Sequence, residues 1–251
     1  MHTLARAREA PAFRELGYWL FRYRRTWRGS IVISVANPLL FLTALGIGLG
    51  KLINRNHSEY LHVPYVTFIL PGMLVAAVMQ AARPRGNYRA AAATPLAPTD
   101  ILYGHLMYWA LRAAQNAILF TGVSILFGAV SPYRAPFLVP IALLVALAFA
   151  IPAAAWSVTV TRRSQLSAVF RFVVLPLYMF SGTFFPIEQL PVWIRPVAWA
   201  TPLWHGVDLC RTVALGTATL PGTLVHTAYL SAMAVIGLFL ARRSYRRTLH
   251  V

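Results

Sequence analysis

The sequence predicts an all-α integral membrane protein with six transmembrane helices. Of the 251 residues, 58% are hydrophobic and only 12% are charged, whereas soluble domains carry about 25% charged residues. The 23 Lys and Arg residues outnumber the 6 Asp and Glu residues, which gives a net charge of +17. These charges fall between long apolar stretches, so they follow membrane topology and no nucleic-acid partner is expected.

Six stretches contain no Asp, Glu, Lys or Arg, and we expect one span in each. A helix needs about 20 apolar residues to cross the hydrocarbon core. The stretch 172–187 is short, but a helix that starts near Ser164 reaches span length if Arg171 extends to the interface. The expected spans are 30–52, 62–82, 106–129, 137–160, 165–185 and 220–241.

The positions of the basic residues predict the orientation. With the N-terminus inside, the inner segments hold most of the arginines, while the outer ones hold only Lys51, Arg55, Arg134, Arg195 and Arg211. Basic residues accumulate on the cytoplasmic side. We therefore expect a multi-pass protein of the bacterial plasma membrane with both termini in the cytoplasm. A cleavable signal peptide is not expected, because the first apolar run starts near residue 29 and has span length.

Residues 9–28 are predicted to form a separate amphipathic helix in the inner interface. Its arginines would face anionic headgroups, and its apolar residues recur at helical spacing. This helix is either a generic basic anchor or also the contact surface for a cytoplasmic partner. The apolar residues are Phe13, Leu16, Leu20, Tyr23 and Trp27.

Several kinds of chemistry are not expected. The only lysine, Lys51, follows Gly46–Gly50 without the spacing or the hydroxyl of a phosphate-binding loop, so any ATP-driven work must come from another chain. One cysteine, Cys210, excludes an internal disulfide and a cysteine-built zinc site. We expect no catalytic residues, no metal and no cofactor. His205 and Asp208 lie within one helical turn, but they lack the third partner that a membrane-embedded enzyme would need.

The third expected span contains strongly polar residues. His105 and Arg112, with Gln115 and Asn116 nearby, could line a path for an anionic or polar substrate. Alternatively, His105 lies near the cytoplasmic end and Arg112 extends to the interface or pairs with a neighbouring helix.

The cytoplasmic loop 83–100 combines arginines with an alanine run that ends at Thr94-Pro95. Alanine favours helix, and the residue before proline leaves helical geometry. A short rigid helix here would suit contact with a partner, although an ordinary basic loop is the alternative.

The outer segment 186–216 and the residues just before it are rich in proline and tryptophan. Prolines interrupt helices and tryptophan favours the membrane interface. We expect two short re-entrant helices in the outer leaflet, with an interfacial belt of no special function as the alternative. The residues that define the segment are Gly182, Phe185, Pro186, Leu190, Pro191, Trp193, Pro202, Asp208 and Arg211.

Two motifs in this region, FSGTFFPIEQLPVWIR (180–195) and TPLWHGVDLCR (201–211), resemble the C-terminal signature of ABC-2 type transporter permeases. The resemblance is greatest to the branch of nodulation protein J, lipooligosaccharide exporters and daunorubicin-type drug exporters. The stretches NPLL (37–40) with GIGLG (46–50), YVTFILPGM (65–73), and TPL (94–96) with DILYG (100–104) also resemble that branch.

The resemblance implies a dimer of permeases, formed with a second copy or a paralogue, that carries two ABC ATPase subunits with their ATP and Mg²⁺. It also implies export of lipids, lipooligosaccharides or amphiphilic drugs, the last of these giving antibiotic resistance. The loop would dock into the ATPase as a coupling helix. Many family members carry an acidic residue after the second span, whereas 81–86 has none here. The residues assigned to coupling are Arg85, Gly86, Tyr88, Arg89, Ala91, Thr94, Pro95 and Leu96.

The alternative function is a secondary carrier or channel for an amphiphile. Such a protein would work without an ATPase and would need an ionisable site in mid-membrane. The six acidic residues lie near span ends or in loops, which favours the exporter.

Overall fold

The computed structural model describes residues 11–50, 63–84, 88–160 and 163–249, and it is helical without strands over these residues. The all-α class predicted from the sequence is confirmed for this part of the chain. The elements are α1 (Pro11–Phe41), η1 (Leu42–Leu49), α3 (Tyr65–Ala81), α4 (Tyr88–Ala92), α5 (Pro98–Leu126), α6 (Ala135–Ser157), α7 (Arg163–Val169), η2 (Phe170–Val174), α8 (Leu175–Met179), η3 (Ile187–Gln189), α9 (Arg195–Trp199), α10 (Pro202–Leu215) and α11 (Leu220–Leu249).

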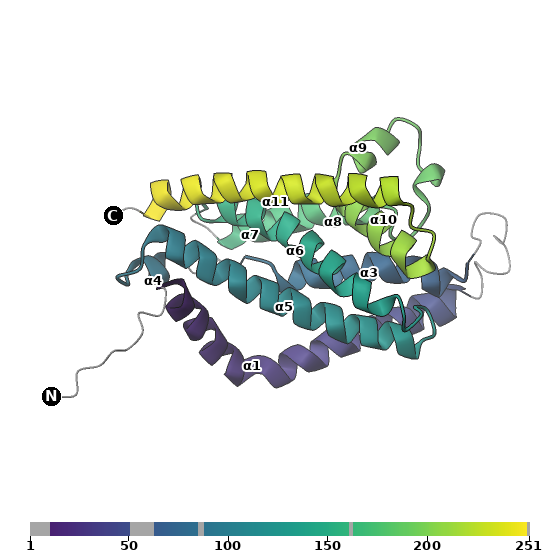
Figure 1. Ribbon diagram of the computed structural model, residues 1–251, viewed down its shortest axis with the longest axis horizontal. Helices are drawn as coiled ribbons and strands as arrows, with labels where there is room; N and C mark the ends of the chain where they lie inside the picture. The colour runs from purple at the N-terminus through teal and green to yellow at the C-terminus, as the bar shows by residue number, and fades with distance from the viewer. Residues whose placement is uncertain (1–10, 51–62, 85–87, 161–162, 250–251) are drawn as a thin grey trace.

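The long helices form an elongated bundle with α1 and α11 on opposite edges in Figure 1. The N-terminal part of α1, the short helix α4 and the C-terminal part of α11 share one end of the bundle, which we call the α4 end. The elements α9 and α10 and the start of α11 lie at the opposite end, which we call the α9 end.

Three helices in the described part of the chain are long and apolar enough to cross a membrane. They are 11–45, 135–157 and 220–249, and the shorter apolar helices Tyr65–Ala81 and Ser167–Met179 accompany them. The helix α5 has 29 residues, but it carries Asp100, His105, Arg112 and further polar residues that lower its hydropathy. The six-span count therefore remains a prediction.

The first helix differs from the predicted arrangement. Residues 11–41 form one helix that continues into the π-helical segment η1, so the interfacial segment 9–28 is not a separate element where it is described. The reason is local, since no proline stands between Pro11 and Pro38 to interrupt the backbone hydrogen bonds. Figure 1 shows that α1 is bent along its length.

The centre of the bundle is α6, which packs against α3, α5, α10 and α11. Many of its buried residues are alanines, including Ala142, Ala146 and Ala150. Small side chains let helices approach closely, which is the usual basis of helix association in membranes. At Gly237 of α11 the approach is so close that an added Cβ would lie 2.7 Å from Cγ of Pro152.

Replacing Gly237 with alanine is expected to destabilise the bundle by about 1–3 kcal/mol, because the added methyl group would collide with the proline ring. Gly122→Ala is the matched control, since no atom lies within 4 Å of its added Cβ and alanine favours helix by about 1 kcal/mol. Thermal unfolding in detergent can be followed with a thiol-reactive fluorophore, because Cys210 is the single cysteine and is fully buried. Equal melting temperatures for the two variants would contradict this account of the α6–α11 contact.

Candidate coupling site and apolar cavity

The loop between α3 and α5 carries the short helix α4, whose first residue is inserted into the bundle. The hydroxyl of Tyr88 lies 2.6 Å from Oγ of Ser157 at the end of α6. The Tyr88 ring makes edge-to-face contacts with His105 of α5 and Tyr245 of α11, at centroid separations of 5.4 and 5.5 Å. One loop side chain therefore contacts three long helices.

A buried carboxylate on α1 joins the same group of side chains. The Oε1 atom of Glu15 accepts a hydrogen bond of 2.8 Å from the indole of Trp19 and lies 3.5 Å from Nε2 of His105. A buried carboxyl group is costly unless polar groups contact it, and Trp19 and His105 both do so here. We call Glu15, Trp19, Tyr88, His105 and Tyr245 the coupling cluster.

Gly104 allows α1 to approach α5 beside this cluster. A Cβ at Gly104 would lie 2.5 Å from Cβ of Glu15 and 2.9 Å from the carbonyl oxygen of Ala12. The Trp19 ring in turn stacks on Tyr108, with centroids 5.1 Å apart and 25° between the planes. The start of α1 is thus fixed against α5 by both close backbone approach and aromatic packing.

A cavity of about 330 Å³ opens between the start of α1 and the loop that follows α4. Thr94 and Pro95 are exposed at this cavity, while Ala91 is buried. The lining residues come from two segments that are far apart in the sequence, the N-terminal helix and the coupling loop. The lining residues are Arg14, Glu15, Tyr18, Trp19, Ala91, Thr94, Pro95 and Leu96.

Most of the predicted coupling residues lie within the described part of the chain. A helix does occupy the loop and ends at Ala92, and Thr94 closes it by donating a 2.6 Å hydrogen bond to the carbonyl of Ala91. Arg89 lies in this helix. Arg85 and Gly86 lie outside the described residues.

The predicted apolar face of the N-terminal helix is not the one that the bundle buries. Phe13, Leu20 and Trp27 are exposed, while Leu16 and Tyr23 are half-buried. The buried residues are Glu15 and Trp19, which the sequence analysis did not single out. One acidic residue four positions before a tryptophan, on a helix rich in arginine, was the signal that could have identified them.

Three of the four residues proposed to line a substrate path contact α1, namely His105, Arg112 and Gln115. His105 belongs to the coupling cluster. Arg112 is 6% exposed, donates a 3.1 Å hydrogen bond to Oε1 of Gln115 and lies 4.7 Å from the centroid of the Tyr23 ring. The hydroxyl of Tyr23 donates to the same Oε1 atom at 2.6 Å, and Asn116 donates to the carbonyl of Arg112. Their role in substrate passage remains a prediction.

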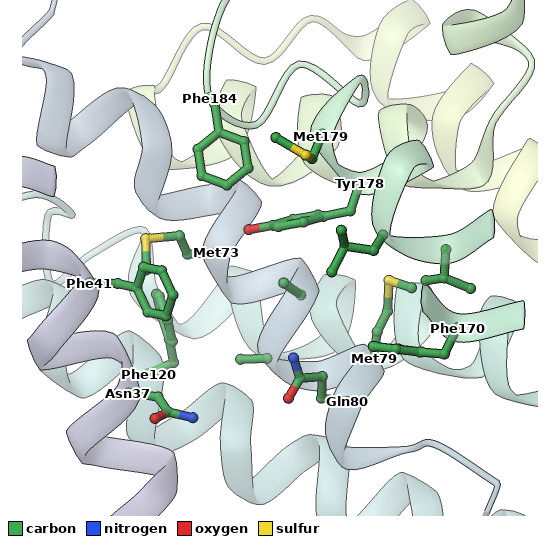
Figure 2. A pocket seen from close by; sticks show the side chains of 14 residues that line it. Asn37, Phe41, Met73, Met79, Gln80, Phe120, Phe170, Tyr178, Met179 and Phe184 are labelled. Carbon is green, nitrogen blue, oxygen red and sulfur yellow. The ribbon is translucent and has the colours of Figure 1, made fainter. Parts of the chain in front are cut away.

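A second cavity, of about 350 Å³, lies among α1, α3, α5 and the η2–α8 segment (Figure 2). Figure 2 shows Asn37 and Gln80 toward one end of it and Tyr178, Met179 and Phe184 toward the other. No charged side chain is among its lining residues. They are Asn37, Phe41, Met73, Ala76, Ala77, Met79, Gln80, Phe120, Phe170, Val174, Leu175, Tyr178, Met179 and Phe184.

At the α9 end, two of the predicted signature residues meet. Gly182 has a φ of +78°, which favours glycine, and its carbonyl accepts a 2.5 Å hydrogen bond from Arg211 of α10. The Arg211 guanidinium also lies 4.0 Å from the centroid of the Phe68 ring. Arg211 therefore ties α10 to the turn after α8 and to α3.

The other signature residues form the short elements around this contact. Phe185 packs against a small apolar cluster that includes Leu190, while Trp193 is 77% exposed. Pro202 is the first residue of α10, and Asp208 lies near His226 of α11. Pro186 and Pro191 flank the segment 187–190, in which η3 lies.

Comparison with known proteins identifies the family. The model of the ABC-2 type transporter family matches residues 18–215. The chain belongs to the ABC-2 type transporter family. It is 29% identical to nodulation protein J of Rhizobium meliloti strain 1021 over 92% of this chain and 94% of that protein. Nodulation protein J of Bradyrhizobium diazoefficiens is 26% identical, with 96% and 95% covered. The inner membrane transport permease YadH of Escherichia coli K12 is 22% identical, with 88% of each chain covered.

Membership in the ABC-2 family makes this chain a membrane transport component of the permease type and agrees with its apolar helices. The resemblance deduced from the motifs is confirmed. The match begins within α1 and ends with α10, so it includes α4 but neither Glu15 nor Tyr245 of the coupling cluster.

The hydrogen bond between Tyr88 and Ser157 can be tested with a double-mutant cycle. Tyr88→Phe and Ser157→Ala are each expected to destabilise the chain, and the double variant should be less destabilised than the sum by about 0.5–1.5 kcal/mol, because both single changes remove the same contact. Thermal unfolding of the four proteins provides the measurement. Strict additivity would show that the 2.6 Å contact contributes nothing.

Proposed function

We propose that this chain is the membrane-spanning subunit of an ATP-driven exporter that moves a lipid, a lipooligosaccharide or an amphiphilic drug out of a bacterial cell. Membership in the ABC-2 family and the similarity to nodulation protein J and to a transport permease support this proposal. The observation that carries it is the insertion of Tyr88 among α5, α6 and α11, because it links a short loop helix to the main body of the bundle.

In this proposal the α4 end faces the cytoplasm and two ABC ATPase subunits. The exposed residues Thr94 and Pro95, next to the cavity at the start of α1, would be the contact surface for the ATPase. Movement of the ATPase would push on α4, and Tyr88 would pass that displacement to three helices. The chain itself binds no nucleotide, and ATP with Mg²⁺ belongs to the partner.

The apolar cavity is the proposed place for the hydrophobic part of the substrate. Its aromatic and methionine side chains suit acyl chains or fused rings, and methionine adapts its shape to different ligands. Asn37 and Gln80 offer hydrogen bonds without a charge, which favours an uncharged polar group at that end. The polar group on α5 around Arg112 remains a second, separate place for a polar headgroup.

A second permease copy would cover the apolar surface beside this cavity. Val32, Leu40 and Phe41 of α1, with Phe172 and Val173 of η2, are between 48% and 75% exposed. Lipid or a partner copy can contact such surfaces. We propose a partner copy because Phe41 lines the cavity and Phe172 and Val173 lie between its lining residues Phe170 and Val174, so that pairing would enclose it. The proposed topology has six spans, both termini inside, and 186–216 re-entrant from outside.

The secondary-carrier alternative depends on one observation. Glu15 and His105 form a buried ionisable pair, which is the kind of group that proton-coupled carriers use. The pair lies at the α4 end beside Tyr88 rather than in the apolar cavity, which favours a role in coupling. Transport in proteoliposomes that contain no ATPase would support the carrier.

Adding charge to the coupling surface should uncouple the complex. Ala93 is exposed directly after α4, and Ala93→Glu is expected to lower ATP hydrolysis by the reconstituted complex at least tenfold, because bulk and charge enter the ATPase contact. The complex would be made with the ABC ATPase encoded beside this chain. Ala218→Glu is the control, since it places the same side chain at an exposed position between α10 and α11. Equal loss in both variants, or in neither, would argue against a coupling surface here.

Filling the apolar cavity should block transport without affecting assembly. Ala77→Phe is expected to reduce ATP-dependent movement of a fluorescent acyl-chain lipid in proteoliposomes at least tenfold, because the ring occupies the cavity, while the ATPase stays bound. Ala168→Phe, at an exposed position of α7, should transport normally. Unchanged transport by Ala77→Phe would show that the substrate does not pass through this cavity. The polar group on α5 would then be the next candidate.

A further inference from the structure

Two histidines from different helices contact each other at the α9 end. Nδ1 of His205, on α10, lies 2.8 Å from Nδ1 of His226, on α11. Both residues are buried, at 7% and 8% exposure. Nε2 of His226 lies 3.1 Å from Oδ2 of Asp208, whose side chain is 30% exposed. The partly exposed carboxylate of Asp208 therefore contacts His226, which in turn contacts His205.

The contact between the two Nδ1 atoms can hold one proton between them but not two. A neutral imidazole has one N–H donor and one acceptor nitrogen, whereas the charged form has two donors. At 2.8 Å one Nδ1 must donate and the other must accept. Asp208 faces the other nitrogen of His226, so a single positive charge on the pair of rings has a carboxylate beside it. A further proton on Nδ1 of His205 would set two N–H groups and two cations against each other, so the rings would have to separate.

The same rings hold the segment 195–215 on α11. The ring of His205 stacks on Tyr229 of α11, with centroids 3.9 Å apart and 18° between the planes. The hydroxyl of Tyr229 donates a 2.6 Å hydrogen bond to the carbonyl of Ala200, just before α10 begins. Trp204 contacts both histidines edge-on, at 4.9 and 5.2 Å. Separation of the rings would therefore loosen several contacts between α10 and α11 together.

We propose that His205 and His226 form a pH-sensitive latch, which holds the segment 195–215 against α11 at neutral pH and releases it in acid. The latch lies at the end of the bundle opposite α4, on the side that would face out of the cell in the proposed topology. It operates on this chain alone and does not depend on an ATPase or a substrate.

Besides the two histidines and Asp208, the titratable group in ring contact with the pair is Tyr229 of α11. Arg211 of α10 interacts with Asp208, Tyr65 is on α3, Arg195 begins α9, and α6 has no titratable residue between 135 and 157. Within the described residues no three His, Cys, Asp or Glu side chains gather as metal ligands. Protonation of His205, at its contact with His226, is therefore the event that would act on the latch.

The direction of the response follows from the surroundings of His205. Burial, and secondly the charge of His226, lower the pKa of His205 from 6.5 to about 4, while a hydrogen bond to the backbone of Trp199 opposes this. The released ring binds a proton more readily than the latched ring. The latch is therefore fully stable above about pH 6.5 and weakens as the pH falls toward 4.

Hydrogen exchange of the full chain in lipid nanodiscs tests the latch. Between pH 7.5 and 4.5, after correction for intrinsic exchange, we expect amides of 195–215 in the wild type to lose protection at least tenfold relative to α3 in the same sample. His205→Gln should abolish this pH dependence, because glutamine can hydrogen-bond to His226 but does not titrate. His105→Gln is the matched control, because it removes a buried histidine at the opposite end of the bundle, and the pH response of 195–215 should persist in it.

Two results would contradict the latch. Wild-type protection of 195–215 that does not change with pH would overturn the proposal, as would an undiminished pH response in His205→Gln. If that variant is unprotected at pH 7.5, His226→Gln takes its place. If both are unprotected, imidazole ¹⁵N shifts of the wild type decide, because an opening without a histidine titrating over the same pH range would also overturn the latch.

Discussion

Hydrocarbon offers a polar group no partner, and this constraint organises the chain. The backbone satisfies it by folding into helices throughout the described residues. Many of the polar side-chain contacts that join different helices lie at one end of the bundle or the other. The coupling cluster occupies the α4 end, while Arg211 and the two histidines occupy the α9 end. Between these ends, α6 packs through alanines, as Ala142 and Ala146 illustrate.

This distribution of contacts determines which parts of the proposed exporter could move relative to one another. Close packing through small side chains leaves the central helices little room to deform separately, so they would tilt as rigid bodies. In this proposal a partner can displace the bundle where a short element packs between the long helices. At the α4 end that element is α4, held by Tyr88, and at the α9 end it is the segment around α10, held by Arg211 and His205. The apolar cavity lies against the α7–η2–α8 region, where Phe172 and Val173 remain exposed.

The sequence predicted the helical class, because this depends on length and composition alone. It also predicted a helix in the cytoplasmic loop, from the alanine run that ends before Pro95. It failed for contacts between distant residues. The face of α1 that is buried depends on where α5 lies, and Gly104 rather than an apolar stripe determines the approach. The sequence places His205 and Asp208 within one turn, but His226 lies on another helix and no local pattern pairs it with them.

The missing acidic residue of the coupling loop can be explained in the same terms. The sequence departs from the family pattern after the second span, because the stretch 81–86 has no acidic residue. The lining of the cavity beside this loop nevertheless contains one carboxylate, that of Glu15 on α1, 3.5 Å from His105. A carboxyl group is therefore present beside the proposed ATPase contact, supplied by a different helix. Because Trp19 donates a hydrogen bond to that carboxyl group and stacks on Tyr108, the group is fixed relative to α5. In the proposed exporter the start of α1 would therefore belong to the coupling surface, and it would move with α4 rather than serve only as an anchor in the interface.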